Sequence, residues 1–155
     1  MASTVSDAVL TVTISESIFL NGSNHGSTKK IALTGINEIS KRIMSVPATP
    51  GTQIYAGAAT AANGTFVTDQ VKYIRITNLD SANSIILHLS DGSSTYSMHE
   101  IAAGHVFFLT DLDSSFETQT SVNLWGTSTV DISEIYAMST HASDDVDIEI
   151  FVASS

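Results

Sequence analysis

The sequence predicts an all-β fold, a single antiparallel β-sandwich of jelly-roll-like type that spans residues 1–155. Apolar residues recur at every second position in many short segments, which is typical of strands with one buried face. Turn dipeptides separate several of these segments, namely Asn21-Gly22, Asn63-Gly64 and Asp91-Gly92. Both observations predict about nine or ten short strands, at the spacing that sandwiches and jelly rolls show.

The composition is that of one compact domain. The chain has 155 residues, of which 43% are hydrophobic and 14% charged, and domains commonly contain about 100–150 residues. It has no cysteine, which excludes zinc–thiolate sites, iron–sulfur clusters and thiol nucleophiles. The first residues have neither a basic segment nor a long apolar run, so we expect no signal peptide and no membrane span. We expect residues 1–7 to form a flexible arm.

Residues 8–20 and 29–35 alternate between apolar and polar side chains on either side of Asn21-Gly22. This pattern predicts two strands joined by a tight turn, with a bulge at Gly35. The apolar face of these strands is expected to consist of Leu10, Val12, Ile14, Ile18, Leu20, Ile31 and Leu33.

Residues 37–46 fit either a helix or a bent strand, because their isoleucines satisfy both periods. We favour a strand, since Pro47 and Pro50 end the segment and no capping residue begins it. Residues 51–57 are a further short strand candidate.

The segment KYIRITNLDSANSIILHLSDG, residues 72–92, predicts two strands joined by a polar loop. In the first strand Ile74 and Ile76 share one face, opposite Arg75 and its neighbours. The loop from Asn78 to Ser84 is expected to be too polar for burial. The inward face of the second strand is Ile85, Leu87 and Leu89, with His88 opposite.

The rest of the chain predicts further strands, at residues 94–111 around Ala102-Ala103-Gly104, 122–127, 131–140 and 145–154. In the first of these pairs we expect Val106 and Phe108 to point inward, with Met98 as a further candidate. The last strand is expected to bury Val146, Ile148, Ile150 and Val152 and to expose Asp145, Asp147 and Glu149.

Charge is unevenly distributed along the chain. The net charge is −10, which argues against nucleic-acid binding, because phosphate contacts require a basic face. All six basic residues lie in the first 75 positions, where four acids leave a net charge of +2; residues 76–155 carry twelve acids and no Lys or Arg. This asymmetry favours an interaction surface, although unevenly distributed solvated charge is the alternative.

The basic residues give the candidate docking site. If their strands are adjacent, Lys29, Lys30, Lys41 and Arg42 could meet, with the remaining two cations nearby. Such a cluster would suit an acidic protein surface or the acidic half of a neighbouring copy. Head-to-tail contacts between unlike faces build rings such as trimers.

The sequence contains no catalytic signature: neither a G-x-S-x-G elbow nor a phosphate-binding loop is present. None of the five histidines has zinc-ligand spacing; His99 and His105 could meet across a hairpin, but two exposed strand residues are the favoured interpretation. The acids of 111–113 and 144–147 could bind calcium, although solvated turns are favoured. We therefore predict no catalytic residue, no metal and no cofactor.

The aromatic residues could in principle stack on sugars. They are scattered along the chain, which favours packing roles in the core and at its rim. The residues in question are Trp125, Tyr55, Tyr73, Tyr96 and Tyr136.

Two segments, VKYIRITNLDSANSIILHLSDGSSTYSMHEIAAGHVFFL (71–109) and VDIEIFVAS (146–154), resemble small β-sandwich virion proteins of tailed bacteriophages. In that family a Tyr-Ile-Arg-Ile-Thr-Asn-Leu-Asp type strand end precedes a polar turn, and an Ala-Gly element opens a Phe-rich strand. The resemblance implies a non-enzymatic structural protein of the virion, assembled in the host cytoplasm. It favours a capsid decoration (cement) protein that bridges neighbouring shell subunits.

The same resemblance implies the major capsid protein or other virion proteins as partners, in a homo-oligomer for which we favour a trimer, without nucleic acid or membrane. Two alternatives stay open. One is a tail accessory protein or a receptor- or carbohydrate-binding module, which a glycan array would detect. The other is a calcium-dependent enzyme or lectin, whose melting temperature a chelator would lower.

Overall fold

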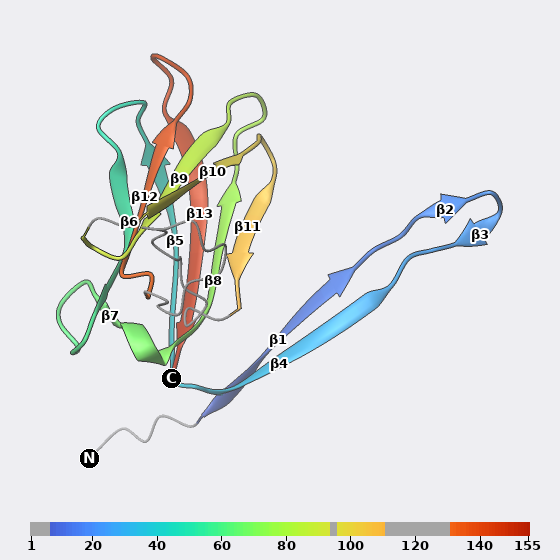
Figure 1. Ribbon diagram of the computed structural model, residues 1–155, viewed down its shortest axis with the longest axis horizontal. Helices are drawn as coiled ribbons and strands as arrows, with labels where there is room; N and C mark the ends of the chain where they lie inside the picture. The colour runs from blue at the N-terminus through green and yellow to red at the C-terminus, as the bar shows by residue number, and fades with distance from the viewer. Residues whose placement is uncertain (1–6, 94–95, 111–130) are drawn as a thin grey trace, which may run out of the picture.

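The body of the protein is built from two mainly antiparallel sheets that face each other (Figure 1). The computed structural model describes residues 7–93, 96–110 and 131–155. Sheet I has the order β11 (Val106–Leu109), β8 (Val71–Asn78), β13 (Val146–Ser154) and β5 (Glu38–Val46). Sheet II has the order β10 (Tyr96–Ile101), β9 (Ile85–Ser90), β12 (Glu134–Ser139), β6 (Thr52–Ala58) and β7 (Phe66–Val67).

The connectivity of these strands is that of a jelly roll. The chain passes from β5 in sheet I to β6 in sheet II, back to β8, and again to β9. After the β9–β10 hairpin it returns to sheet I at β11, to sheet II at β12, and ends in sheet I at β13. Each late strand is thereby inserted between two earlier ones, β12 between β6 and β9 and β13 between β5 and β8. The predicted jelly-roll-like sandwich is confirmed.

The core lies between the sheets and follows the predicted alternation. Ile74 and Ile76 of β8 are fully buried, while Arg75 between them lies on the outer face with Tyr73 and Thr77. The same period-two pattern holds in β9 and β13. The fully or almost fully buried residues of these two strands are Ile85, Leu87, Leu89, Val146, Ile148, Ile150 and Val152.

Strand β11 has the opposite orientation from the one predicted. Phe107 and Leu109 pack against the core, whereas Val106 and Phe108 are 50% and 40% exposed. The reason is register: Phe107 pairs with Ile76, and residues paired across a sheet share a face. Met98 is likewise wrong as an inward candidate, because it is 62% exposed on sheet II.

Asn78, predicted to lie in an exposed loop, is buried as the last residue of β8. Its side-chain amide donates to the carbonyls of Asn83 and Ile101, and its Oδ1 accepts from the N–H of Asp80. A buried amide is tolerated when its polar atoms are paired. Asn78 therefore fixes the start of the β8–β9 loop instead of being solvated.

Residues 8–36 form a long β-hairpin that projects from the body, which we call the arm (Figure 1). Its stem pairs β1 (Ala8–Ser15) with β4 (Thr28–Ile36), and its tip pairs β2 (Phe19–Leu20) with β3 (Ser23–Asn24). The predicted turn is confirmed, with positive φ at Asn21 and Gly22. Gly35 also has positive φ, next to a shift in the pairing register, as the predicted bulge requires.

The arm corrects the expectation that these two strands belong to the sandwich. They pair with each other and join neither sheet. The projecting segment is thus the hairpin of residues 8–36. The flexible N-terminal segment predicted for residues 1–7 is a different one, and its residues 1–6 lie outside the described residues. The alternating pattern could not reveal this, because a two-stranded hairpin with one apolar face has the same period as a sandwich strand.

Other strand and turn predictions are confirmed, and one predicted strand lies outside the described residues. Residues 37–46 are a strand, as favoured, and β6 and the turn at Asn63-Gly64 also form as predicted. The predicted strand at 122–127, with Trp125, lies outside the described residues. A single 3₁₀ turn, Thr68–Gln70, is the only helical element in the described part of the chain. The described residues therefore contain no helix long and apolar enough to cross a membrane.

Candidate functional site

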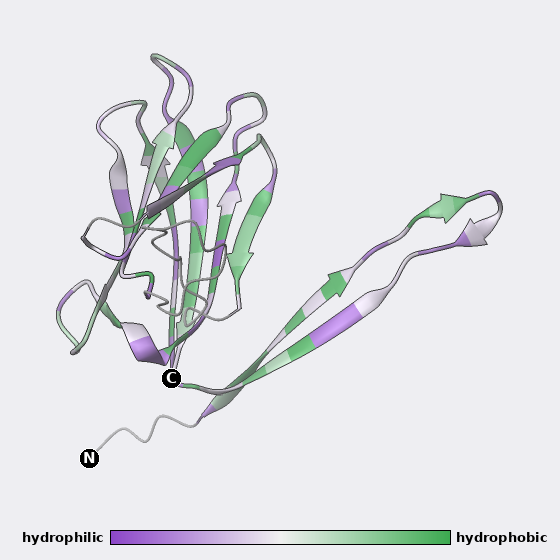
Figure 2. Ribbon diagram, in the orientation of Figure 1, coloured by the Kyte–Doolittle hydropathy of each residue, from purple (hydrophilic) through white to green (hydrophobic). Residues whose placement is uncertain are grey.

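The strongest candidate for a functional surface is an apolar groove between the arm and the outer face of sheet I. It has a volume of about 630 Å³. One wall is the stem residues of β1 from Leu10 to Ile14, and the other is the outer face of β8, β11 and β13. The residues of this second wall are Tyr73, Arg75, Thr77, Val106, Phe108 and Phe151. Figure 2 shows apolar residues on both walls, along β1 and β11.

The strand register places the groove residues in rows. In one row, Arg75 of β8 is paired with Phe108 of β11 on one side and with Phe151 of β13 on the other. Val106 and Thr77 form the next row. Because paired residues of neighbouring strands share a face, these aromatic and β-branched side chains lie on one surface, with Arg75 between the two phenylalanines.

The charged side chains at the groove are paired within the protein. Arg75 forms an ion pair with Glu149, and the Nζ of Lys41 lies 3.0 Å from the other oxygen of the same carboxylate. Glu149 is thus held between two cations on neighbouring strands. Among the residues that line the groove, Arg75 is the one that carries a charge, and that charge is paired.

A small second hydrophobic cluster attaches the arm to the body. Ile36, Tyr73 and Ala153 are buried there, and Leu10 and Leu33 pack against them. Burial raises the pKa of the Tyr73 hydroxyl above its ordinary value, although the nearby Arg75 acts in the opposite direction. The base of the arm is therefore fixed on sheet I.

The tip of the arm is the most exposed apolar segment of the described residues. The exposed fractions of Ile18, Phe19 and Leu20 are 54%, 72% and 58%. Three consecutive apolar residues cannot all face one side of a strand. Monomeric proteins seldom expose contiguous apolar segments unless these take part in binding.

The four predicted docking residues do not form one cluster. Lys29 and Lys30 lie on the arm, where they pair with Ile14 and Thr13 and so point to opposite faces of the hairpin. Strand β4 pairs with β1 and β5 pairs with β13, so the two basic pairs are not on adjacent strands, which corrects the expectation from sequence.

Lys41 and Arg42 also point to opposite sides of β5. Lys41 faces outward to Glu149, whereas the Arg42 guanidinium donates to the carbonyl of Ile54 in sheet II. These two residues are engaged within the fold. Of these four residues, Lys29 and Lys30 alone have neither an ion pair nor a side-chain hydrogen bond among the described residues.

A second candidate surface lies on the outer face of sheet II. The ring of His88 stacks on Tyr96 at a centroid distance of 4.8 Å, and the ring of Tyr136 approaches its edge at 6.2 Å. Together with Met98 and Met138, His88 and Tyr136 line a pocket of about 350 Å³. These tyrosines are scattered along the sequence; three strands bring them together around His88, and nothing local in the sequence indicates that.

The predicted metal candidates do not converge in the described part of the chain. His99 contacts Ser97 and the ring of Phe107, whereas the Nδ1 of His105 lies 2.9 Å from the Ala103 carbonyl oxygen. The described residues contain no group of three His, Asp or Glu side chains that could hold an ion. The acids at 111 and 113 lie outside the described residues.

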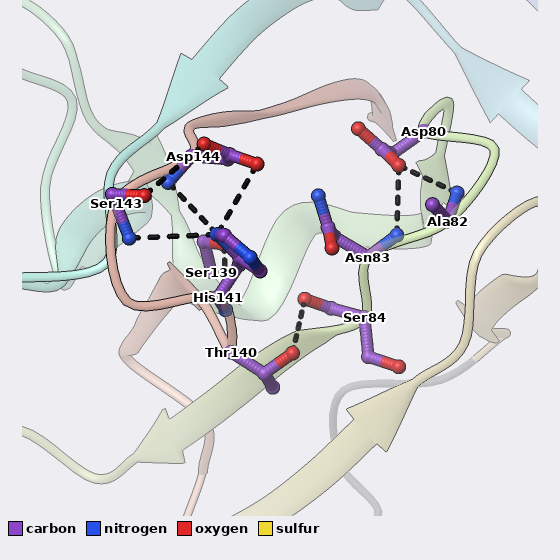
Figure 3. A network of polar contacts seen from close by, with 9 residues as sticks. All are labelled: Asp80, Ala82, Asn83, Ser84, Ser139, Thr140, His141, Ser143 and Asp144. Carbon is purple, nitrogen blue, oxygen red and sulfur yellow. Dashed lines mark hydrogen bonds and ion pairs between the residues drawn. The ribbon is translucent and has the colours of Figure 1, made fainter.

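Asp144 of the β12–β13 loop belongs to a polar network (Figure 3). The carboxylate of Asp144 lies 3.2 Å from the Nδ1 of His141. Thr140 donates to the carbonyl of Ser84 through both its N–H and its hydroxyl, which ties this loop to the β8–β9 loop. The network thus holds two loops together at one end of the sandwich.

Asp80 organises the second of these loops (Figure 3). One of its carboxylate oxygens accepts from the N–H groups of Ala82 and Asn83, at 2.7 and 2.8 Å. These backbone donors, first that of Asn83, lower the pKa of Asp80 below its ordinary value. This is the pattern of a turn-forming aspartate.

Comparison with known protein families, curated proteins and solved structures gave no match to this chain.

Proposed function

We propose that this chain is a non-enzymatic structural protein of a tailed-phage virion, a capsid decoration protein that binds the shell and bridges neighbouring subunits. The observation that carries the proposal is the arm, a projecting hairpin with an exposed apolar tip beside an apolar outer sheet face. Such surfaces suit contacts between proteins. The assignment to a virion rests on the sequence resemblance in residues 71–109 and 146–154.

A rigid sandwich with a projecting arm suits a protein that links its neighbours. The buried core fixes the shape of the body, and the arm extends the reach of each copy beyond it (Figure 1). Each contact can be modest, since many copies on one particle act together. The role of the protein would then be mechanical: resistance of the shell to internal pressure.

Within this proposal Lys29 and Lys30 are the docking charges to test first. Lys41 and Arg42, also predicted from sequence, have partners within the fold, so changing them would alter stability as well as docking. The arm lysines are exposed on a strand whose pairing does not depend on their charge. An acidic shell surface would attract them.

The experiment measures occupancy on particles that lack the protein. Purified wild-type protein is added to such particles, and the bound fraction is measured after sedimentation and by imaging. We expect saturable binding, weakened in Lys29→Glu/Lys30→Glu and retained in Lys72→Glu, a basic residue of the body. Absence of wild-type binding would contradict the proposed function; unchanged binding of the double variant would contradict only the role of these lysines.

The pocket on sheet II favours a second candidate function, a receptor- or carbohydrate-binding module. Aromatic rings with exposed faces are suited to stacking on sugar rings, and 350 Å³ falls in the size range of small-ligand sites. A glycan array with the isolated protein tests this candidate. Binding that Tyr136→Ala abolishes, and Phe108→Ala on the opposite sheet does not, would support it; an empty array would exclude the glycans it carries.

A further inference from the structure

Two apolar surfaces of this chain have no partner within it. Among the described residues eleven large hydrophobic side chains are exposed; four lie on the arm and four on the outer face of sheet I. The four on the arm are Val9, Ile18, Phe19 and Leu20, and the four on sheet I are Ile39, Ile43, Val106 and Phe108. The exposed apolar area is therefore concentrated on one projection and on one receiving face.

The chemistry of the two surfaces is complementary. The tip segment, residues 17–28, contains no Lys, Arg, Asp or Glu. The groove contains one charged residue, Arg75, and that charge is already paired with Glu149. The tip has no Lys, Arg, Asp or Glu, so its three apolar residues can enter such a groove without leaving a charged side chain unpaired.

The tip cannot fill the groove of its own chain. The stem that carries the tip also forms one wall of that groove, and the hairpin leads the tip away from the body (Figure 1). Every copy nevertheless presents one tip and one groove, in equal number. A second copy is thus an occupant of matching chemistry and fixed stoichiometry.

We propose that the arm tip of one copy, with Phe19 and Leu20, inserts into the groove of a second copy, against Val106 and Phe108 of β11. The contact joins unlike surfaces, which build a ring of copies when the rotation between successive copies closes. The stem stays attached to sheet I of its own chain, and only the tip contacts the second copy. This inference concerns self-association, and it stands whether or not the protein docks on a shell.

The first test measures the mass of the full-length protein in solution by light scattering after gel filtration. We expect the wild type to have a mass of at least two chains of 16.4 kDa each. The variants Phe19→Ser/Leu20→Ser and Phe108→Glu should each have the mass of a single chain. Met98→Ser, which alters a comparably exposed residue of sheet II, is the matched control and should keep the wild-type mass. All these positions are exposed, and circular dichroism verifies that each variant is folded.

A monomeric wild type at high micromolar concentration would overturn the proposal. So would a tip variant that keeps the wild-type mass. Either result would leave the groove to a different occupant, such as a shell protein or an apolar small molecule.

The second test identifies the contact itself. Because the chain has no cysteine, a single engineered thiol reports one position. Phe19→Cys and Phe108→Cys chains are mixed and oxidised, and the linked peptides are identified by mass spectrometry. We expect a crosslink that joins a Phe19→Cys chain to a Phe108→Cys chain, and none when Met98→Cys replaces the groove partner.

Links between two tips only, or no link at all, would contradict insertion of the tip into the groove. Both tests use the isolated protein and no particles. Failure of shell binding therefore leaves this inference intact, and its own failure leaves the proposed function intact.

Discussion

Single side chains set how the stability of the body depends on pH. Tyr55 is 2% exposed, its ring stacks on Phe66 at 5.9 Å, and its hydroxyl makes no hydrogen bond with the described residues. Burial raises the pKa of Tyr55 to about 12. Asp80 is the opposite case, a solvent-facing carboxylate whose pKa is lowered by backbone N–H groups. The two residues therefore act in different pH ranges.

Tyr55→Phe is expected to raise the free energy of unfolding at neutral pH by about 1 kcal/mol, because it removes a buried hydroxyl that has no partner. The folded-state pKa of about 12 exceeds the unfolded value of 10.0, so ionisation of Tyr55 does not affect stability below about pH 10, and the wild type loses stability as the pH rises from 10 towards 12, where the phenol ionises more readily in the unfolded chain. The variant should therefore lose less stability in alkaline solution. Urea unfolding at several pH values tests this, with the exposed Tyr96→Phe as control; a large loss of stability would show that the hydroxyl is satisfied.

Asp80→Asn is expected to lower the melting temperature at neutral pH, because the charged carboxylate accepts the two backbone N–H groups more strongly than an amide does. Since the folded pKa lies below the ordinary 3.8, the contribution is present above that value and is lost as the pH falls through the folded pKa. The difference between variant and wild type should consequently vanish in strong acid. Thermal scans across the acid range measure it, with exposed Asp145→Asn as control; a difference independent of pH would contradict this cause.

At the level of elements, strand pairing decides which side of an alternating segment is buried. Strand β11 is apolar throughout, Val106-Phe-Phe-Leu, so its own sequence contains no preference for either face. Pairing with β8 places Phe107 beside Ile76 and Phe108 beside Arg75. The arm shows the same effect on a larger scale, because its strands alternate like those of the body but pair only with each other.

Phe107→Ala and Phe108→Ala test the orientation of β11. We expect Phe107→Ala to lower the free energy of unfolding by about 2 kcal/mol, roughly half of what a fully buried Phe costs, since this residue is only partly buried. Phe108→Ala should have a much smaller effect in the monomer. Chemical denaturation of both variants gives the comparison, and equal losses, or a larger loss for Phe108, would contradict the register.

At the level of the whole molecule, the protein consists of a well-packed body and an arm attached at its base. The main core cluster draws its residues from β5 through β13, including Ile132 before β12, and contains none from the arm. The arm contributes to the smaller cluster around Tyr73 and Ala153. The proposed ring would couple these parts between copies, because the arm of one copy would cover the sheet of another.

Hydrogen exchange should resolve these two parts. In the monomeric Phe108→Glu variant we expect slow exchange in the central strands β8, β9, β12 and β13, and fast exchange in β2 and β3, which lack packed neighbours. In the wild type the tip should become protected as the protein concentration rises. Mass spectrometry measures the exchange rates of the central strands and of the tip. A tip that exchanges equally fast at every protein concentration would contradict its burial in a second copy.

The sequence by itself determined the class of the fold, the positions of most strands and turns, and the buried faces of β8, β9 and β13. These follow from local chemistry, since alternating side chains and Asn-Gly dipeptides restrict the backbone wherever they occur. Tertiary structure alone decided which strands pair, and with that the orientation of β11, the burial of Asn78 and the separation of the arm from the sandwich. It likewise dispersed the predicted basic cluster and brought His88, Tyr96 and Tyr136 together. Register across a sheet relates residues far apart in the chain, and one-dimensional periodicity contains no information about that relation.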